Sequence, residues 1–241
     1  MSDTPPGPDP APNGRDRLAR GAAVLCVVIA CVLLAGAVVQ ATPGGGAGSN
    51  GSSFETRSVF PGDRTSGLER LRSIHEVDDE GRGTATLEGH AASEFEALAF
   101  DDGGQGQIEP DPEWVEEHIV TADVPLLDGP VRCNEVLLPQ LEGALAELEE
   151  RDLGHLIDPA EYGGCWVPRH IMHEPDRALS LHAWGLAVDL NVATNPYGAE
   201  PQMDERVVDV FERWGFAWGG HWRTPDGMHF ELLEVRDEPR P

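Results

Sequence analysis

The sequence predicts a folded domain of mixed α+β class that follows a membrane-spanning helix. Two amphipathic helical patterns and two short strand patterns predict the domain, and one long apolar run predicts the span. A chain of 241 residues allows one ordinary domain with additional segments. We expect a cytoplasmic N-terminus at 1–20, a transmembrane anchor at 21–41, a flexible tether and poorly defined stalk at 42–109, and the main folded domain at 110–241.

The anchor is predicted from residues 21–41, GAAVLCVVIACVLLAGAVVQA, which contain no charged side chain. A helix of this length crosses a hydrocarbon core of about 30 Å. Arg15, Arg17 and Arg20 precede the run and the next basic residue is Arg57, so the positive-inside tendency places the rest of the chain outside the cytoplasm. The alternative is a cleaved signal peptide, although this run is longer than the usual signal-peptide core.

The segment after the anchor has two textures. Residues 42–53, TPGGGAGSNGSS, are typical of a flexible tether. Residues 54–109 mix glycines, acids and short apolar clusters without a sustained period. We expect a loosely ordered stalk or a small added element there.

The regular elements of the domain are predicted from apolar spacing. In residues 134–150 leucines recur at three- and four-residue intervals, which predicts an amphipathic helix, and residues 203–214 show a second apolar stripe followed by Gly215. Two short strands are predicted at 186–190, LAVDL, and 228–233, MHFELL.

Charge and cysteine usage narrow the possible partners and the compartment. The formal net charge is −26 and the chain has no lysine, which argues against nucleic acid and other phosphate-rich partners. Cys26 and Cys31 lie inside the apolar run, so Cys133 and Cys165 remain as an isolated pair in the external part. We hypothesise a Cys133–Cys165 disulfide, and two unrelated buried thiols are the alternative.

The strand patterns place polar side chains together. Alternation puts Asp189 on the face of its strand opposite to Leu186, Val188 and Leu190, and His229 opposite to the apolar residues of the other strand. If the strands are near neighbours, the two side chains converge. Gly185 permits a tight turn, so His182 can fold back toward Asp189.

Two imidazoles and one carboxylate form a three-ligand set for a catalytic Zn²⁺ ion. Asp226 lies three residues before His229 and could serve as the base that accepts a proton from water. Taken singly, however, a histidine in a core or an aspartate near a glycine is more often a structural residue.

The motifs resemble those of zinc peptidases of bacterial cell-wall metabolism. SLHAWGLAVD at 180–189 and DGMHFE at 226–231 are similar to the SxHxxGxAxD and acid-x-x-His motifs of VanY-type D-alanyl-D-alanine carboxypeptidases and of phage-endolysin L-alanyl-D-glutamate endopeptidases. The similarity covers about residues 110–235. It implies a small, mainly antiparallel sheet with packed helices, as in these peptidases and the Hedgehog domain.

The resemblance also implies roles for single residues. Zn²⁺ would bind to His182, Asp189 and His229, with Asp226 as the general base. Arg169 would grip a carboxylate of the substrate, and a solvated surface arginine is the alternative. Ser180 would help to hold the substrate backbone, and a turn or capping residue is the alternative.

We therefore expect a membrane-anchored, extracytoplasmic zinc peptidase that hydrolyses peptidoglycan stem peptides. An aspartate rather than a glutamate as base favours the L-alanyl-D-glutamate endopeptidase branch. The alternatives are a D-alanyl-D-alanine carboxypeptidase, a non-catalytic zinc-containing module that binds the cell wall, and a protein without a metal.

Overall fold

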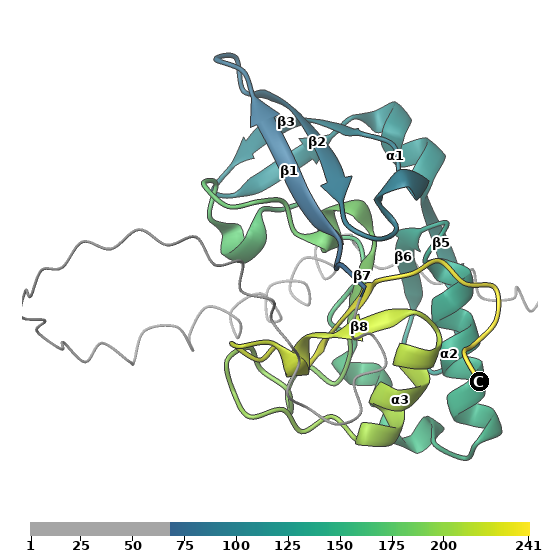
Figure 1. Cartoon of the computed structure of the whole chain (residues 1–241). Coiled ribbons are helices and arrows are strands. Elements are labelled where there is room, and N and C mark those ends of the chain that lie inside the picture. The colour runs from purple at the N-terminus through teal and green to yellow at the C-terminus, as the bar shows by residue number, and fades with distance from the viewer. Residues whose placement is uncertain (1–67) are drawn as a thin grey trace, which may run out of the picture. The chain divides into compact units, whose positions relative to one another are not determined.

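The computed structural model describes residues 68–241 (Figure 1). The predicted span at 21–41 lies outside this part of the chain. Within residues 68–241 no helix is long and apolar enough to cross a membrane. The described part is of mixed α+β class, with antiparallel strand pairing throughout its three sheets.

The elements follow one another along the chain with short connections. The strands are β1 (Arg72–Val77), β2 (Arg82–Glu88), β3 (Leu98–Gly104), β4 (Gln107–Pro110), β5 (Ile119–Asp123), β6 (Pro130–Asn134), β7 (Ala187–Asp189), β8 (Phe216–Trp218) and β9 (His229–Leu232). The α-helices are α1 (Pro112–His118), α2 (Leu138–Glu150) and α3 (Glu205–Arg213). Two of the 3₁₀ turns matter for the site, η4 (Ile171–His173) and η5 (Leu181–Trp184).

Residues 72–110 form a regular four-stranded sheet in the order β1-β2-β3-β4. For this region the sequence indicates a loosely ordered stalk or a small added element. Each strand has only a few residues that point into the core. In β3 only Leu98 and Phe100 are buried. The Phe100 ring packs over Gly83 of β2, where a Cβ atom would lie only 2.2 Å from the ring. Such short alternation, with a glycine at one inward position, gives little periodic signal in the sequence.

The turn between β3 and β4 joins this sheet to the rest of the domain. The amide of His170 donates to the carbonyl of Gly106 at 2.8 Å, and the amide of Ile108 donates to the carbonyl of Pro168 at 3.2 Å. Gly106 has a φ of 71°, and a Cβ there would lie 2.2 Å from the carbonyl oxygen of His173. This close approach requires glycine and fixes the chain around Arg169 against the sheet.

The two predicted long helices are present with shorter bounds. The first begins at Leu138 rather than at residue 134, because Pro139 occupies its first turn. Helix α3 begins after Asp204, whose side chain accepts a hydrogen bond from the amide of Arg206. Both apolar stripes are buried in one hydrophobic core that also includes Phe100 of the first sheet.

The sheet that holds the candidate site has the order β7-β9-β8. Asp189 stands directly opposite His229, and Ala187 opposite Glu231. Val188 and Phe230 are fully buried on the other face. The predicted strands are therefore neighbours, with the polar and apolar faces that alternation requires.

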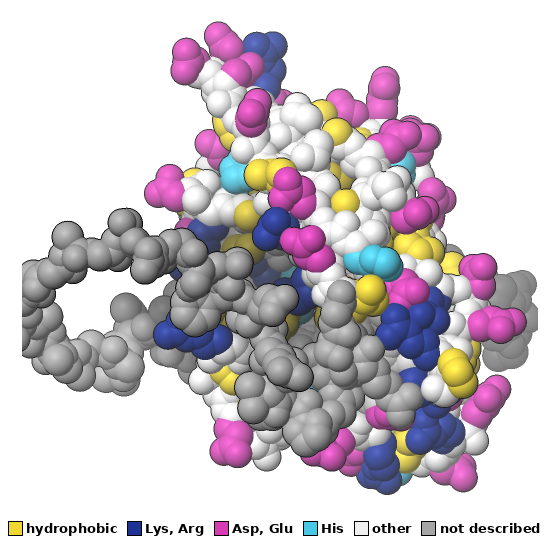
Figure 2. All heavy atoms as spheres, viewed as in Figure 1, with side chains coloured by type: hydrophobic (Ala, Val, Ile, Leu, Met, Phe, Trp, Pro, Cys, Tyr) yellow, Lys and Arg dark blue, Asp and Glu magenta, His cyan; other side chains and the backbone are white. Residues whose placement is uncertain are grey.

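Cys133 of β6 and Cys165 form a disulfide with a Cα–Cα distance of 5.4 Å, which confirms the hypothesis from the sequence. The bridge ties the β5–β6 hairpin to the segment that leads to Arg169. Figure 2 shows acidic side chains spread over the visible face of the described part, in keeping with the net charge of −26.

The disulfide should contribute measurably to stability. Replacing both cysteines, Cys133→Ser with Cys165→Ser, is expected to lower the free energy of unfolding by about 2–4 kcal/mol, because the unfolded chain loses a cross-link. Urea denaturation of the full-length protein measures this change, and reduction of the wild-type protein should reproduce it. Equal unfolding midpoints for the variant and the oxidised wild type would contradict the prediction.

Candidate metal centre

Local structure places His182, Asp189 and His229 at one point. The hydroxyl of Ser180 caps the 3₁₀ turn η5 by accepting from the amide of His182 at 3.3 Å. Gly185 ends that turn in the left-handed region, with a φ of 66°, and a Cβ there would lie 2.6 Å from the amide nitrogen of Asn134. The chain then reverses into β7, so His182 lies beside the strand that ends at Asp189.

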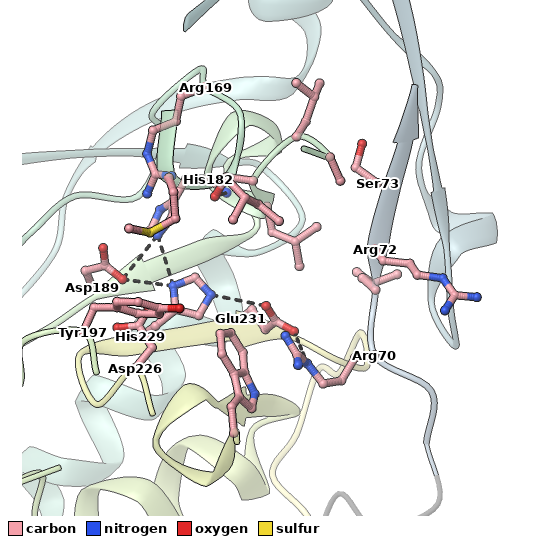
Figure 3. A pocket seen from close by; sticks show the side chains of 18 of the residues that line it. Arg70, Arg72, Ser73, Arg169, His182, Asp189, Tyr197, Asp226, His229 and Glu231 are labelled. Carbon is pink, nitrogen blue, oxygen red and sulfur yellow. Dashed lines mark hydrogen bonds and ion pairs between the residues drawn. The ribbon is translucent and has the colours of Figure 1, made fainter. Parts of the chain in front are cut away.

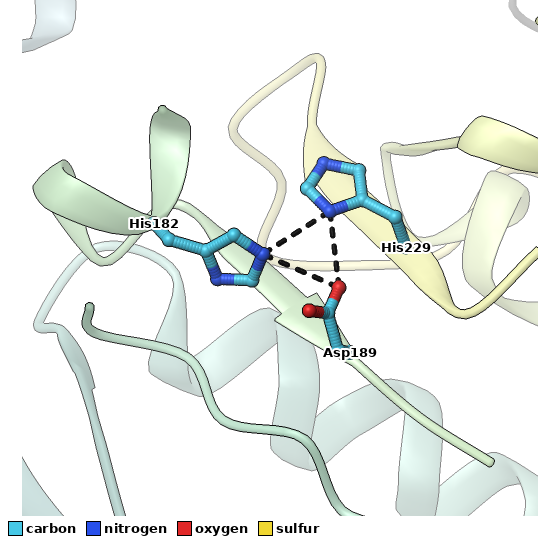
Figure 4. A group of neighbouring side chains, drawn as sticks. All are labelled: His182, Asp189 and His229. Atoms are coloured by element: carbon cyan, nitrogen blue, oxygen red, sulfur yellow. Dashed lines mark hydrogen bonds and ion pairs between the residues drawn. The ribbon is translucent and has the colours of Figure 1, made fainter. Parts of the chain in front are cut away.

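The three side chains contact one another directly (Figure 4). Nε2 of His182 lies 3.2 Å from Oδ1 of Asp189 and 3.2 Å from Nδ1 of His229. Nδ1 of His229 lies 3.1 Å from the same carboxylate oxygen. The three predicted ligands are therefore brought together, and each offers one atom to a shared point.

The outer partners of both rings decide which atoms carry hydrogen. Nδ1 of His182 lies 2.9 Å from the carbonyl oxygen of Cys165, which can only accept, so this nitrogen donates. Nε2 of His229 lies 3.2 Å from a carboxylate oxygen of Glu231, which also accepts. In their neutral forms both histidines therefore direct lone pairs at each other and at Asp189. Such a cluster needs a cation at its centre, either a proton or a metal ion.

Without a metal, the cluster holds a proton. Burial alone would lower the pKa of His229, but hydrogen bonds to Asp189 and Glu231 raise it to about 10. Burial alone would raise the pKa of Asp189, but His182 and His229 bring it well below its usual range. A metal ion must therefore displace a proton from His229, whereas Asp189 is already ionised.

Asp226 lies in the turn before β9 and borders the same pocket (Figure 3). Its amide donates to the carbonyl of Gly219 at 2.9 Å, and a Cβ at position 219 would lie 2.6 Å from the carbonyl oxygen of Asp226. Oδ1 of Asp226 is buried without a hydrogen-bond partner among the described residues. Burial raises the pKa of this carboxyl group, which suits a group that exchanges protons.

Arg169 also borders the pocket. One guanidinium nitrogen donates to the carbonyl of His170 at 3.3 Å. Burial lowers the pKa of Arg169, while the charges of Asp189 and Asp226 act in the opposite direction. The guanidinium therefore lies within electrostatic reach of both carboxylates, in a position to meet an anionic substrate group.

Ser180 has an observed structural role as the cap of η5. It also borders the pocket, but its hydroxyl already accepts the amide of His182. Ser180 is therefore a capping residue, as the alternative from the sequence has it, and its contact with a substrate backbone stays a prediction.

The pocket has a volume of about 560 Å³ and extends from the three ligands to the beginning of β1 (Figure 3). Several of its residues were given no role at the site from the sequence, namely Arg70, Arg72, Ser73, Tyr197 and Glu231. Glu231 could have been found, because alternation puts it on the same face of β9 as His229. Arg70 could not, since only the folded chain brings it to this strand.

A comparison with protein families agrees with this geometry. Residues 161–232 match the family model described as D-alanyl-D-alanine carboxypeptidase. The chain has no significant match among curated proteins or solved structures. The matched segment contains the three metal-ligand candidates together with Arg169, Ser180 and Asp226, and it supports a metal-dependent peptidase of this type. The first sheet and Cys133 lie outside it.

The donor set should bind one divalent ion. Full-length protein loaded with Zn²⁺ and dialysed is expected to retain about one equivalent, because two imidazoles and a carboxylate are sufficient ligands. His182→Ala should lower the retained zinc to about a tenth or less, measured by elemental analysis.

His90→Ala, at an exposed histidine outside the pocket, is the matched control and should retain zinc as the wild type does. Lowering the pH of the dialysis buffer should weaken binding, since protons compete with the ion for His229. A His182→Ala protein with the zinc content of the wild type would contradict the assignment.

Proposed function

We propose that the protein is a membrane-anchored, extracytoplasmic zinc peptidase that hydrolyses peptidoglycan stem peptides. The observation that supports it most is that three lone-pair donors converge in one pocket with Asp226, one of whose carboxyl oxygens has no hydrogen-bond partner within residues 68–241. All four residues fall in the segment that matches the carboxypeptidase family model. Zinc is proposed as the ion because it prefers nitrogen ligands with one carboxylate and an open position.

Each residue of the pocket has a task in such a reaction. When bound, a zinc ion supplies Lewis acidity, which polarises a carbonyl group and makes water more acidic. Asp226 accepts the proton of the attacking water and later delivers it to the leaving amine. The raised pKa of Asp226 favours this return step, because the protonated form is easier to reach than for an exposed aspartate.

Arg169 has the task of holding the substrate. A planar guanidinium binds a carboxylate with two parallel hydrogen bonds, which fixes both the position and the orientation of the peptide. The chain around Arg169 is hydrogen-bonded to the β3–β4 turn through the amides of Ile108 and His170, so this grip is rigidly placed. Rigid placement lowers the entropic cost of aligning the scissile bond.

The bond that is cut has two candidates. The aspartate at position 226 favours an L-alanyl-D-glutamate endopeptidase, since the resembling endopeptidases use Asp as the base. The description of the matched family model favours the second candidate, a D-alanyl-D-alanine carboxypeptidase.

Purified muropeptides with intact pentapeptide stems test the proposal. Mass analysis of the products is expected to show a cut next to D-glutamate, whereas released terminal D-alanine would favour the carboxypeptidase. Asp226→Asn should lower kcat/KM by about 10²–10⁴-fold with unchanged zinc content, because the proton acceptor is lost.

The matched control is Asp237→Asn, at an exposed carboxylate outside the pocket, which should leave kcat/KM unchanged. Zinc-loaded protein that binds peptidoglycan but cleaves no muropeptide would instead favour a non-catalytic cell-wall-binding module. An Asp226→Asn protein as active as the wild type would remove Asp226 from the mechanism.

The location is proposed from the sequence alone. Residues 21–41 contain no charged side chain, Arg15, Arg17 and Arg20 directly precede them, and no basic residue follows until Arg57. This asymmetry supports an anchor with the pocket outside the cytoplasm. The protein is expected to sediment with membranes, to resist extraction by high salt and to dissolve in detergent. A mature protein that begins near residue 42 would show that a signal peptide is removed instead.

A further inference from the structure

Arg70, the residue two before β1, reaches the candidate metal centre from outside the matched segment (Figure 3). Its Nε donates to Oε1 of Glu231 at 2.6 Å. Its guanidinium carbon lies 3.8 Å from the centre of the Trp222 ring. Arg70 therefore makes an ion pair and a cation–π contact at the same time.

Glu231 connects Arg70 to a metal-ligand candidate. Its side chain is only 4% exposed, and its second oxygen lies 3.2 Å from Nε2 of His229. Both carboxylate oxygens are thus engaged, one with Arg70 and one with His229. A buried carboxylate held on both sides has little freedom to rotate, and neither does the imidazole that it contacts.

The direction of this chain of contacts matters for the metal. A carboxylate on the outer nitrogen of a metal-ligating histidine fixes the tautomer and the plane of the ring. With Nε2 of His229 held by Glu231, Nδ1 faces Asp189 and His182. Arg70 in turn holds the Glu231 carboxylate in place through its hydrogen bond to Oε1, because a buried carboxylate without a partner would be costly.

The backbone of Arg70 is itself well held. The carbonyl of the preceding Glu69 accepts from the amide of His90 at 2.8 Å, and the following Leu71 is buried in the core. At the end of β2, Gly89 approaches so closely that a Cβ there would lie 2.4 Å from the carbonyl oxygen of Arg70. The first sheet thus provides a firm base for the side chain.

From these contacts we infer that Arg70 is a positioning residue for the metal centre, which it serves by clamping Glu231 against His229 while stacking on Trp222. The sheet β1–β4, for which the sequence suggests no role, is then part of the peptidase site. This inference rests on the metal site of the proposed function. An arginine is needed because lysine has no planar fork that can pair with a carboxylate and lie on an indole together.

The test measures metal affinity rather than turnover. Zinc dissociation constants of the full-length protein are determined by competition with a chromophoric chelator. Arg70→Gln is expected to weaken zinc binding by about 10–100-fold, the usual effect of removing an outer partner of a metal ligand. Arg70→Lys, which keeps the charge, should lie between the wild type and Arg70→Gln.

The sign of the effect is diagnostic. Removing a positive charge near a cation site would by itself strengthen metal binding. Weaker binding therefore supports positioning, whereas equal or tighter binding in both Arg70→Gln and Arg70→Lys would overturn it. In a Glu231→Gln background the Arg70→Gln change should have little further effect, since the connecting contact is already lost.

Two comparisons complete the design. Arg82→Gln removes an exposed arginine of the same sheet, outside the pocket, and should leave the zinc affinity unchanged. The visible spectrum of the Co²⁺-loaded protein should change in Arg70→Gln but not in Arg82→Gln, because it reports ligand geometry. If the wild type binds zinc and the Arg70 variants bind it with the same affinity, this inference alone is refuted. If the wild type binds no zinc, the proposed metal site is refuted as well.

Discussion

The described part of the molecule is organised around three lone pairs that face one another. The outer nitrogens of His182 and His229 are committed to a carbonyl and a carboxylate, so their inner nitrogens and Asp189 present electron density to a common point. This arrangement is unfavourable unless a cation occupies the centre. A fold that maintains it must hold the ligands from outside, and the surrounding elements do this.

Three parts of the chain supply that support. The disulfide fixes the segment whose Cys165 carbonyl orients His182, and the register of β7 with β9 sets Asp189 opposite His229. The first sheet and the residues that lead into it contribute at two places. The β3–β4 turn holds the chain around Arg169, and Arg70, just before β1, contacts Glu231. Segments outside the family match therefore shape the pocket, and one hydrophobic core joins them to the matched segment.

The local patterns of the sequence, together with the family resemblance, predicted which residues lie at the centre of the site. Period-two alternation predicted the faces of Asp189 and His229, and the leucine spacing predicted most of helix α2. The first sheet was harder to predict, because its strands bury only one or two residues each and Gly83 makes room for Phe100. The contact of Arg70 with Glu231 spans 161 residues, and no local pattern encodes a pairing that depends on tertiary packing.

Cys165 has two roles at once, because its sulfur bonds to β6 and its carbonyl orients His182. Formation of the Cys133–Cys165 disulfide and the orientation of His182 therefore depend on the same residue. A newly made chain in a reducing compartment would have a freer Cys165 segment and a less ordered ligand. Under the proposed extracytoplasmic location, the site would reach its final form only after the chain enters a compartment where thiols are oxidised, which would delay activity until export.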